Sequence, residues 1–274
     1  MSVAALSTAN IHYDGEGPAT GRPVVCVHGY AMGGSLWAPL RRRLAAEGLR
    51  CLTPTWPLGA HPEALHPGAP STLPGVAATV AAFLEALDLH DVVLVGNDTG
   101  GLVAQLVAVH HPERLGALVL TSCDAFENFP PPVLRPFVLA SRSRASFRAA
   151  VWPLRLAPVR RRAYGGLAHT DIDGLTAEWV RPALADPAVV EDLRRLTASL
   201  AQETSVEVGA RLGEIQLPTL IAWSADDVFF PVEDAHHLQA EIPHAKLEVI
   251  DGARTFSMID RPDRLAGLVA AAAA

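Results

Sequence analysis

Several features that would assign a class at once are missing from this sequence of 274 residues. No apolar run is long enough to span a bilayer, and the first ten residues, M-S-V-A-A-L-S-T-A-N, lack the basic stretch of a signal peptide. The three cysteines form an odd, scattered set, which argues against a disulfide framework and for a reducing compartment. We therefore expect a soluble, cytoplasmic protein.

Charge and short motifs exclude further classes. The net charge is −7, so the chain as a whole is not drawn to nucleic acid or to anionic lipid. No His/Cys spacing is typical of a metal site, and no P-loop or dinucleotide fingerprint is present, so neither a metal nor an organic cofactor is expected. The one basic cluster, residues 155–162, is interpreted as a solvated face, with a site for an anionic substrate as the alternative.

Short β-branched segments alternate with longer helical ones over residues 1–123 and again over residues 213–274. Strands are expected at residues 24–27, 50–55, 92–95, 117–122, 219–223 and 246–250. Helices are expected at residues 35–47, 72–87, 101–110, 232–241 and 262–273. This order predicts an α/β fold with a mostly parallel sheet that helices cover on both faces.

The alternation stops over residues 124–212, which are rich in proline and arginine and contain no strand-like run. Helical pieces are expected at residues 133–143 and 189–202. Because the alternation resumes afterwards, the segment is predicted to be a helical lid inserted over the sheet, and not a separate domain. The predicted core is therefore built from residues 1–123 and 213–274.

A sharp strand-to-helix turn is predicted at G-N-D-T-G, residues 96–100. Glycines are needed there because side chains would collide with the neighbouring strand and helix, and the turn lifts Asp98 above the edge of the sheet. The helix N-terminus and the backbone amide of Thr99 would stabilise an ionised carboxylate or a developing oxyanion. The alternative is that Asp98 only caps the helix.

The chain resembles the α/β-hydrolase superfamily over nearly its whole length. V-C-V-H-G-Y, residues 25–30, is similar to the family's oxyanion-hole turn, which implies the amide of Tyr30 as the partner of the Thr99 amide. S-A-D-D-V-F-F-P, residues 224–231, is similar to the family's acid loop and implies Asp227 as the orienting acid. Asp98 at the nucleophile's position resembles the epoxide-hydrolase and haloalkane-dehalogenase branch. In that branch a carboxylate attacks carbon to form an ester, and a His–Asp pair activates water to hydrolyse it.

The segment after the last strand departs from this resemblance. It reads G-A-R-T-F, residues 252–256, where the family reads G-A-G-H-F, so Thr255 occupies the place of the catalytic histidine. Threonine cannot take up a proton near neutral pH and cannot serve as the general base. The other histidines are weak replacements: His28 orients its loop more often than it does chemistry, His61, His66 and His169 lie in segments that could reach the site, and His110, His111, His236, His237 and His244 are expected to lie away from it.

Four further residues are candidates for supporting roles. Epoxide hydrolases of this branch use two lid tyrosines, whereas only Tyr164 lies in the insertion. Haloalkane dehalogenases place a tryptophan after the nucleophile to hold halide, where this chain has Thr99; Trp152 or Trp179 could take that role, although tryptophans in such positions more often belong to the core of the lid. Asp124, just past an expected strand, is either a second acid that supports the site or a helix cap.

Three functions remain open at this point. The first is a hydrolase of epoxide, C–halogen or ester type that acts through Asp98 with an atypical, His-deficient triad. The second is an isomerase, cyclase or lyase in which Asp98 is a general acid/base, and it predicts a raised Asp98 pKa because an apolar lid disfavours the ionised form. The third is a non-catalytic receptor. In each case the ligand is a hydrophobic small molecule in an apolar pocket.

Overall fold

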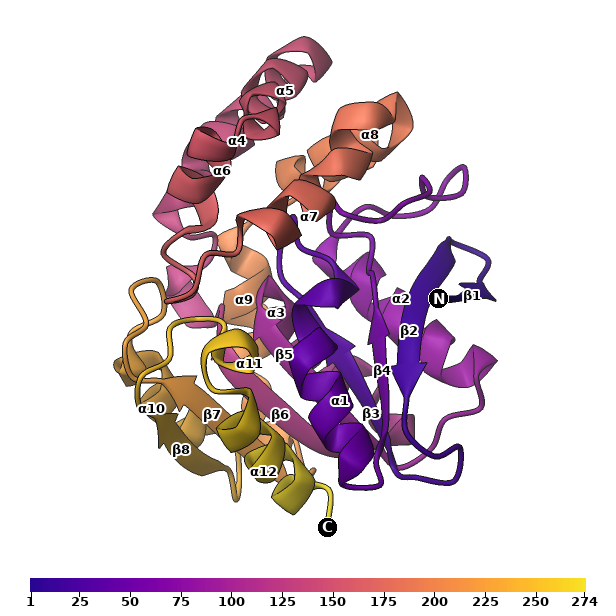
Figure 1. Cartoon of the computed structure of the whole chain (residues 1–274), viewed down its shortest axis with the longest axis vertical. Coiled ribbons are helices and arrows are strands. Elements are labelled where there is room, and N and C mark those ends of the chain that lie inside the picture. Colours follow the sequence, from indigo (N-terminus) through magenta and orange to yellow (C-terminus); the bar gives the residue numbers. More distant parts are fainter.

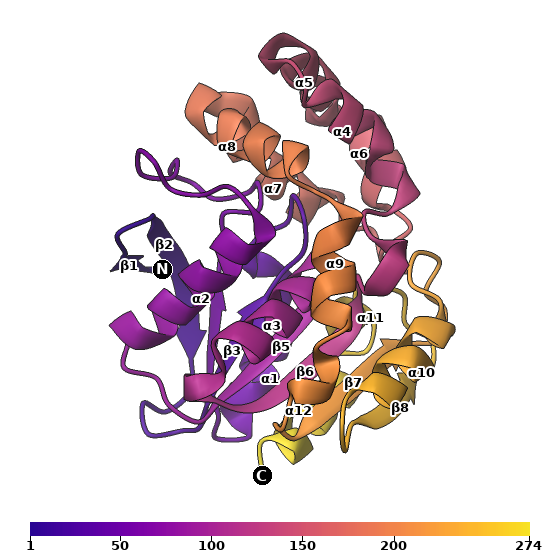
Figure 2. The same ribbon diagram turned by 180° about the vertical axis from the view of Figure 1, so that it is seen from behind.

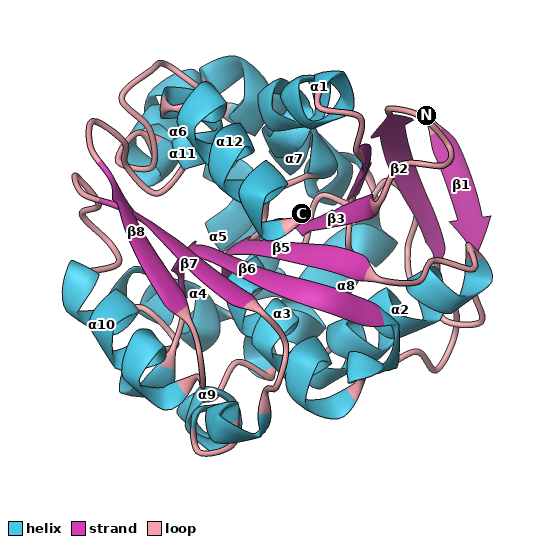
Figure 3. Cartoon of the chain, turned by 90° about the horizontal axis from the view of Figure 1, so that it is seen from below, coloured by secondary structure: helices cyan, strands magenta, loops and turns pink.

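An eight-stranded sheet forms the centre of the computed structural model, which describes residues 1–274 (Figure 3). The strands are β1 (Ser2–Ala5), β2 (Asn10–Glu16), β3 (Pro23–Val27), β4 (Arg50–Pro54), β5 (Val92–Asp98), β6 (Leu115–Cys123), β7 (Thr219–Ser224) and β8 (Lys246–Ile250). They lie in the order β1-β2-β4-β3-β5-β6-β7-β8. β2 is antiparallel to both of its neighbours, and all pairings from β4 to β8 are parallel. The predicted α/β class with a mostly parallel sheet is confirmed.

Helices cover both faces of the sheet, as expected (Figures 2 and 3). One face carries α1 (Ala38–Ala46), α11 (Ser257–Asp260) and α12 (Pro262–Ala272). The other face carries α2 (Leu73–Ala86), α3 (Thr99–His110), α9 (Gln202–Gly209) and α10 (Val232–Glu241). Burial on both sides explains why the central strands are continuously apolar and do not alternate. No helix has both the length and the apolar character needed to cross a membrane.

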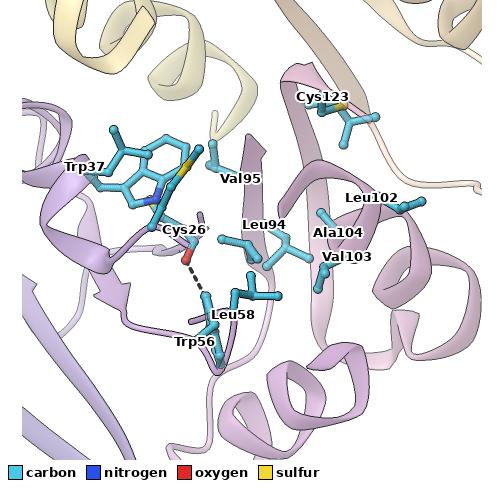
Figure 4. Close-up of a cluster of buried hydrophobic side chains, with 14 of the residues drawn as sticks. Cys26, Trp37, Trp56, Leu58, Leu94, Val95, Leu102, Val103, Ala104 and Cys123 are labelled. Carbon is cyan, nitrogen blue, oxygen red and sulfur yellow. Dashed lines mark hydrogen bonds between the residues drawn. The ribbon is translucent and has the colours of Figure 1, made fainter. Parts of the chain in front are cut away.

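The core beneath the sheet's carboxyl edge is closely packed around β3 and β5 (Figure 4). The indole of Trp56 donates a hydrogen bond to the carbonyl of Cys26 at 2.9 Å, which ties the loop after β4 to β3. Trp37 and Leu94 are fully buried nearby. All three cysteines are free and buried. This packing fixes the ends of the two strands from which the candidate site is built.

The segment between β6 and β7 contains helices and no strand. α4 (Arg135–Ala140), α5 (Arg144–Val151), α6 (Ala157–Tyr164), α7 (Asp173–Ala185) and α8 (Pro187–Ala198) rise above the sheet at the top of Figure 1. The short 3₁₀ segments of the chain are η1 (Gly34–Trp37), η2 (Pro112–Arg114), η3 (Phe126–Asn128), η4 (Pro132–Leu134), η5 (Trp152–Arg155) and η6 (Leu212–Glu214). The division into a core and a lid at residues 124–212 stays a prediction.

The helices above the sheet differ in detail from those expected. α5, α6 and α7 were not predicted, since prolines and exposed arginines interrupt their apolar pattern. The expected helices at residues 133–143 and 189–202 are both shorter. Ser141 Oγ donates to the carbonyl of Val138 at 2.7 Å, and Ser199 Oγ donates to the carbonyl of Leu196 at 2.7 Å. These bonds compete with helix continuation, so α4 and α8 end there.

The strands β1 and β2 were not predicted either. β1 consists of small, mostly exposed residues, and the only buried residue of β2 is Ile11. Neither segment has the continuous apolar run or the regular alternation that marks a strand in sequence. β2 pairs with β4 and β1 pairs with β2, both antiparallel, so the two strands extend the sheet beyond β4.

Candidate active site

Asp98 stands at a strained turn between β5 and α3. Its backbone has φ 55° and ψ −136°, a conformation that non-glycine residues rarely adopt. The turn is tight, because a Cβ on Gly96 would lie 2.6 Å from the carbonyl oxygen of Gly100 and one on Gly100 would lie 2.2 Å from that of Val27. Asp98 is formally the N-cap of α3. It bonds the first amide of the helix, however, whereas an ordinary cap reaches the second or third.

One oxygen of the Asp98 carboxylate is held by two backbone amides. Oδ1 accepts from the amide of Thr99 at 2.7 Å and from that of Tyr30 at 3.3 Å. These are the two amides that the sequence implied as an oxyanion hole. Oδ2 has no hydrogen-bond partner in the protein, and Asp98 lines a cavity. Burial raises the pKa of Asp98 from 3.8 to about 6, although the two amides oppose that shift.

This pKa predicts that Asp98→Asn is stabilising above pH 6. The carboxyl binds its proton more tightly in the native state than in the unfolded state. Its ionisation therefore does not lower the free energy of unfolding below pH 4, and lowers it by the whole effect of the pKa difference above pH 6. Native stability is therefore lost as the pH rises through that window, by about 3 kcal/mol. Urea unfolding at pH 4 and pH 8 should show the variant near wild type at pH 4 and more stable at pH 8. Glu207→Gln, which removes an exposed carboxyl without a salt bridge, is the control, and an equal gain at both pH values for Asp98→Asn would contradict the argument.

Gly29 provides the space that the Asp98 carboxyl occupies. A Cβ at this position would lie 2.1 Å from Oδ1 and 2.5 Å from Cγ of Asp98. Sequence analysis did not identify this residue as part of the site, because the contact joins positions far apart in the chain. The H-G dipeptide was the only signal that could have indicated it.

We expect Gly29→Ala to displace the Asp98 carboxyl and to lower turnover by on the order of 100-fold, the effect of misplacing a reacting group by about 1 Å. Turnover of a compound that the wild type converts is the measurement. Gly267→Ala is the matched control, since a Cβ there has no atom within 4 Å. Wild-type turnover in a folded Gly29→Ala protein would mean that the close approach of Gly29 to the Asp98 carboxyl is not needed for activity.

Asp227 and Thr255 lie side by side. Oδ1 of Asp227 accepts from Thr255 Oγ1 at 2.9 Å and from the amides of Phe229 and Phe230 at 2.8 and 3.0 Å. Oδ2 of Asp227 is buried and has no partner. Burial raises the pKa of Asp227, against the effect of these hydrogen bonds. Asn97, the neighbour of Asp98, donates from Nδ2 to the carbonyl of Thr255 at 2.9 Å and so ties the two segments together.

His28 is fully buried and has both ring nitrogens engaged. Nε2 accepts from the amide of Trp56 at 2.8 Å, so Nδ1 carries the proton and donates to the carbonyl of Gly29 at 3.0 Å. Burial lowers its pKa to about 4, so the ring is neutral near pH 7. His28 thus orients the loop that carries Gly29 and the Tyr30 amide, and it has no nitrogen free for proton transfer to a ligand.

The other histidines are also engaged elsewhere. His61 is buried against Asp192, with 3.5 Å between Nε2 and Oδ2, and His169 Nε2 lies 3.0 Å from Asp226. His66 Nδ1 bonds the carbonyl of Ser7 at 3.1 Å. No histidine lines the cavity or bonds Asp98. The remaining ones lie in β2, before β5, at the end of α3, on the exposed side of α10 and before β8: His12, His90, His110, His111, His236, His237 and His244.

Asp124 lies behind the turn and not in the cavity. Its Oδ2 accepts from Thr99 Oγ1 at 2.8 Å, and its buried Oδ1 has no partner. Burial and the nearby Asp98 carboxylate raise its pKa. The interpretation as a helix cap is wrong, because the residue that precedes the next helical turn is Ala125 and its side chain makes no capping bond. The Asp124 carboxylate is thus linked to the Asp98 turn by hydrogen bonds only through Thr99, and its charge acts on the Asp98 carboxylate through space.

The aromatic candidates divide into one that lines the cavity and two that do not. Tyr164 lines it, and its hydroxyl donates to the carbonyl of Ala31 at 3.1 Å. Trp179 is buried outside the cavity, where Nε1 donates to Ser35 Oγ at 2.9 Å. Trp152 is 53% exposed. Neither tryptophan is placed to hold a halide beside Asp98, because the indole N–H of one is already used and the other faces solvent.

The cavity above Asp98 has a volume of about 120 Å³ and is lined by 17 residues, 14 of them hydrophobic. Asp98 is the only Asp, Glu, Lys, Arg or His among them. Residues that sequence analysis did not single out form most of the wall: Ala31, Met32, Pro131, Val133, Leu134, Phe137, Val151, Leu154, Ala163, Leu167, Leu193, Phe229 and Phe230. No cluster of three or more His, Cys, Asp or Glu is arranged to bind a metal ion. The site thus presents one carboxylate to an apolar ligand.

Comparisons with known proteins concern the fold and the family of the chain. A family model described as alpha/beta hydrolase fold matches residues 22–262. A 2-hydroxy-6-oxononadienedioate/2-hydroxy-6-oxononatrienedioate hydrolase of Cupriavidus pinatubonensis is 29% identical over 252 residues, which cover 88% of this chain and 82% of that protein. Haloalkane dehalogenase 2 of Mycobacterium bovis is 27% identical over 277 residues, 96% of this chain and 91% of that one. A thermophilic esterase from Thermogutta terrifontis superposes with a TM-score of 0.75 at 21% identity, over 95% of this chain and 91% of the esterase, which indicates a shared fold.

Proposed function

The chain belongs to the alpha/beta hydrolase fold family, and we propose that it is an enzyme that converts a hydrophobic small molecule through Asp98 without hydrolysing it. Asp98 acts as a general acid/base in an isomerisation, a cyclisation or an elimination. One observation carries this proposal: Thr255, and not an imidazole, donates to Asp227 at 2.9 Å, while no histidine lines the cavity. A water-activating base is therefore missing from the place where a hydrolase needs it.

The electrostatics of Asp98 suit proton transfer near neutral pH. A pKa of about 6 keeps the carboxylate ionised at pH 7 and still basic enough to accept a proton, the condition under which general catalysis is most efficient. Oδ2 is the oxygen without a partner and is the one that would accept the proton. Apolar walls exclude water, which strengthens the interaction of Asp98 with a ligand and protects a reactive intermediate from hydrolysis.

A hydrolase remains the second candidate, because the same carboxylate geometry serves nucleophilic attack. Oδ2 would attack an sp³ carbon, the leaving group would depart with its electron pair, and an ester would form whose carbonyl oxygen is Oδ1 between the two amides. The similarity to a haloalkane dehalogenase favours this candidate. Without a base to activate water, such an ester would persist. The third candidate, a receptor, would bind the ligand and leave it unchanged.

An isotope experiment separates the three candidates. Apolar compounds would first be screened for those that raise the melting temperature, since a ligand of the native state stabilises it. Each ligand would then be incubated with the protein in H₂¹⁸O and in D₂O, followed by mass spectrometry of the small molecule and of the intact protein. We expect a product without ¹⁸O, deuterium at carbon where protonation completes the reaction, and an unmodified protein. Product containing ¹⁸O would establish a hydrolase, an adduct on Asp98 would establish a nucleophile, and an unchanged ligand would establish a receptor.

A further inference from the structure

The helices between β6 and β7 concentrate positive charge in a chain that is acidic overall. Residues 129–170 contain eight arginines and no Asp, Glu or Lys, so this segment carries +8 in a chain of net charge −7, and the remaining residues carry −15. Residues 132–164, from η4 to α6, are called the arm below. The arm rises away from the sheet at the top of Figure 1. The cluster at residues 155–162 is one end of this larger basic surface.

Most of the arm's arginines are free to meet a partner outside the chain. Arg160 is buried and forms an ion pair with Asp173 at 2.9 Å. Arg144 and Arg161 pair with acids outside the arm, Glu191 and Asp171, at 3.2 and 3.3 Å. The five that are exposed and form no ion pair are Arg135, Arg142, Arg148, Arg155 and Arg162.

Large apolar side chains are exposed among these arginines. Leu139 is 62% exposed and follows Arg135 by four residues, so the two share a face of α4. Trp152 is 53% exposed and follows Arg148 by the same spacing, and the guanidinium of Arg155 lies 3.1 Å from its ring centroid. A face exposed only to water has no need of Leu139 or Trp152. Arginine interleaved with leucine and tryptophan is typical of helices that lie in the interface of an anionic bilayer.

We propose that the arm docks on an anionic lipid surface. A nucleic acid would satisfy the arginines and would leave Leu139 without an apolar partner, whereas acyl chains accept it. The other side of the arm lines the cavity, through residues that include Leu134, Phe137 and Leu154. An apolar ligand dissolved in the bilayer therefore has a short apolar route to Asp98. The interface itself does not depend on the chemistry at Asp98.

The acidic remainder of the chain does not prevent this docking. At physiological ionic strength, charges are screened beyond a Debye length of about 8 Å, so a bilayer that meets the arm feels mainly the arginines. Any other orientation would bring part of the −15 carried by the other residues within a Debye length of the anionic lipid, which would repel it. The two effects together orient the molecule with the arm toward the surface and the sheet away from it.

Vesicle co-sedimentation of the full chain tests the proposal. We expect binding to phosphatidylcholine vesicles that contain about a third phosphatidylglycerol, little binding to pure phosphatidylcholine, and weaker binding as salt increases. The double variant Arg142→Gln/Arg148→Gln should bind on the order of 20-fold more weakly, since each arginine near the surface is worth about fivefold. Arg42→Gln/Arg181→Gln removes two exposed, unpaired arginines from α1 and α7 and should bind like wild type.

A second variant separates the apolar part of the interaction from the charge. Leu139→Ser should weaken binding several-fold while the slope of binding against salt stays unchanged, because no charge is removed. Melting temperatures confirm that each variant is folded. No binding to anionic vesicles at low salt, or equal losses in the two double variants, would overturn the proposal. Tighter binding to a short RNA or to polyglutamate than to the vesicles would also overturn it, in favour of another polyanion.

Discussion

We expect Asp98→Asn to lower turnover by at least 100-fold, and by as much as 10,000-fold, the range that a positioned general acid/base contributes. The asparagine amide keeps the shape of the side chain and can still accept from the amides of Thr99 and Tyr30. It can neither take up a proton at neutral pH nor attack carbon. The loss therefore reports on the carboxylate itself and applies to both enzymatic candidates.

Two features make this loss interpretable. The same variant is expected to be more stable than wild type above pH 6, so unfolding cannot account for it. Asp226→Asn is the matched control, because Asp226 is an exposed acid of the neighbouring loop that faces His169 and has no contact with the cavity. It should keep turnover within about threefold of wild type, as surface substitutions usually do. Full activity in Asp98→Asn would remove Asp98 from the mechanism and favour a site elsewhere in the cavity.

The sequence predicted the features of this molecule that depend on neighbouring residues. The sharp turn at Asp98 follows from glycines two residues away on either side, and the alternation of strands and helices follows from local periodicity. The family resemblance, applied to the segment at residues 252–256, implied that Thr255 lies beside Asp227. Its role in the reaction stays a prediction.

Contacts between distant segments could not be read in the same way. The role of His28 depends on a hydrogen bond from Trp56, and the space for Asp98 depends on Gly29, in the loop after the neighbouring strand β3. The cavity wall consists of leucines and phenylalanines that have the same pattern in sequence as ordinary core residues. The exclusion of Trp152 from the cavity depends on how the helices above the sheet pack. Sequence periodicity says which face of a helix is apolar, and not which apolar face meets a ligand.

The unpartnered oxygen of Asp227 leads to the second prediction, that Thr255→His creates hydrolytic activity if Asp98 is a nucleophile, as in the hydrolase candidate. Oδ2 of Asp227 is buried beside Thr255 without a hydrogen bond, a costly arrangement that an imidazole N–H would relieve. The ring would then be oriented by the carboxylate, with its other nitrogen free to activate water. If Asp98 forms an ester with a haloalkane or an epoxide, the variant should release it 100- to 10,000-fold faster than wild type, a typical contribution of a general base.

Thr255→Asn is the control for this gain, because asparagine fills part of the same space and cannot act as a base at neutral pH. Halide release or diol formation would be followed together with the intact mass of the protein. A persistent adduct in the wild type and in Thr255→Asn, with turnover only in Thr255→His, would show that the base is the one missing part of a hydrolase. A folded Thr255→His protein that shows neither adduct nor release would mean that Asp98 does not attack carbon, which is the result expected if Asp98 only transfers protons. Turnover only in Thr255→His would therefore mean that the residue at position 255 decides whether an ester at Asp98 is hydrolysed.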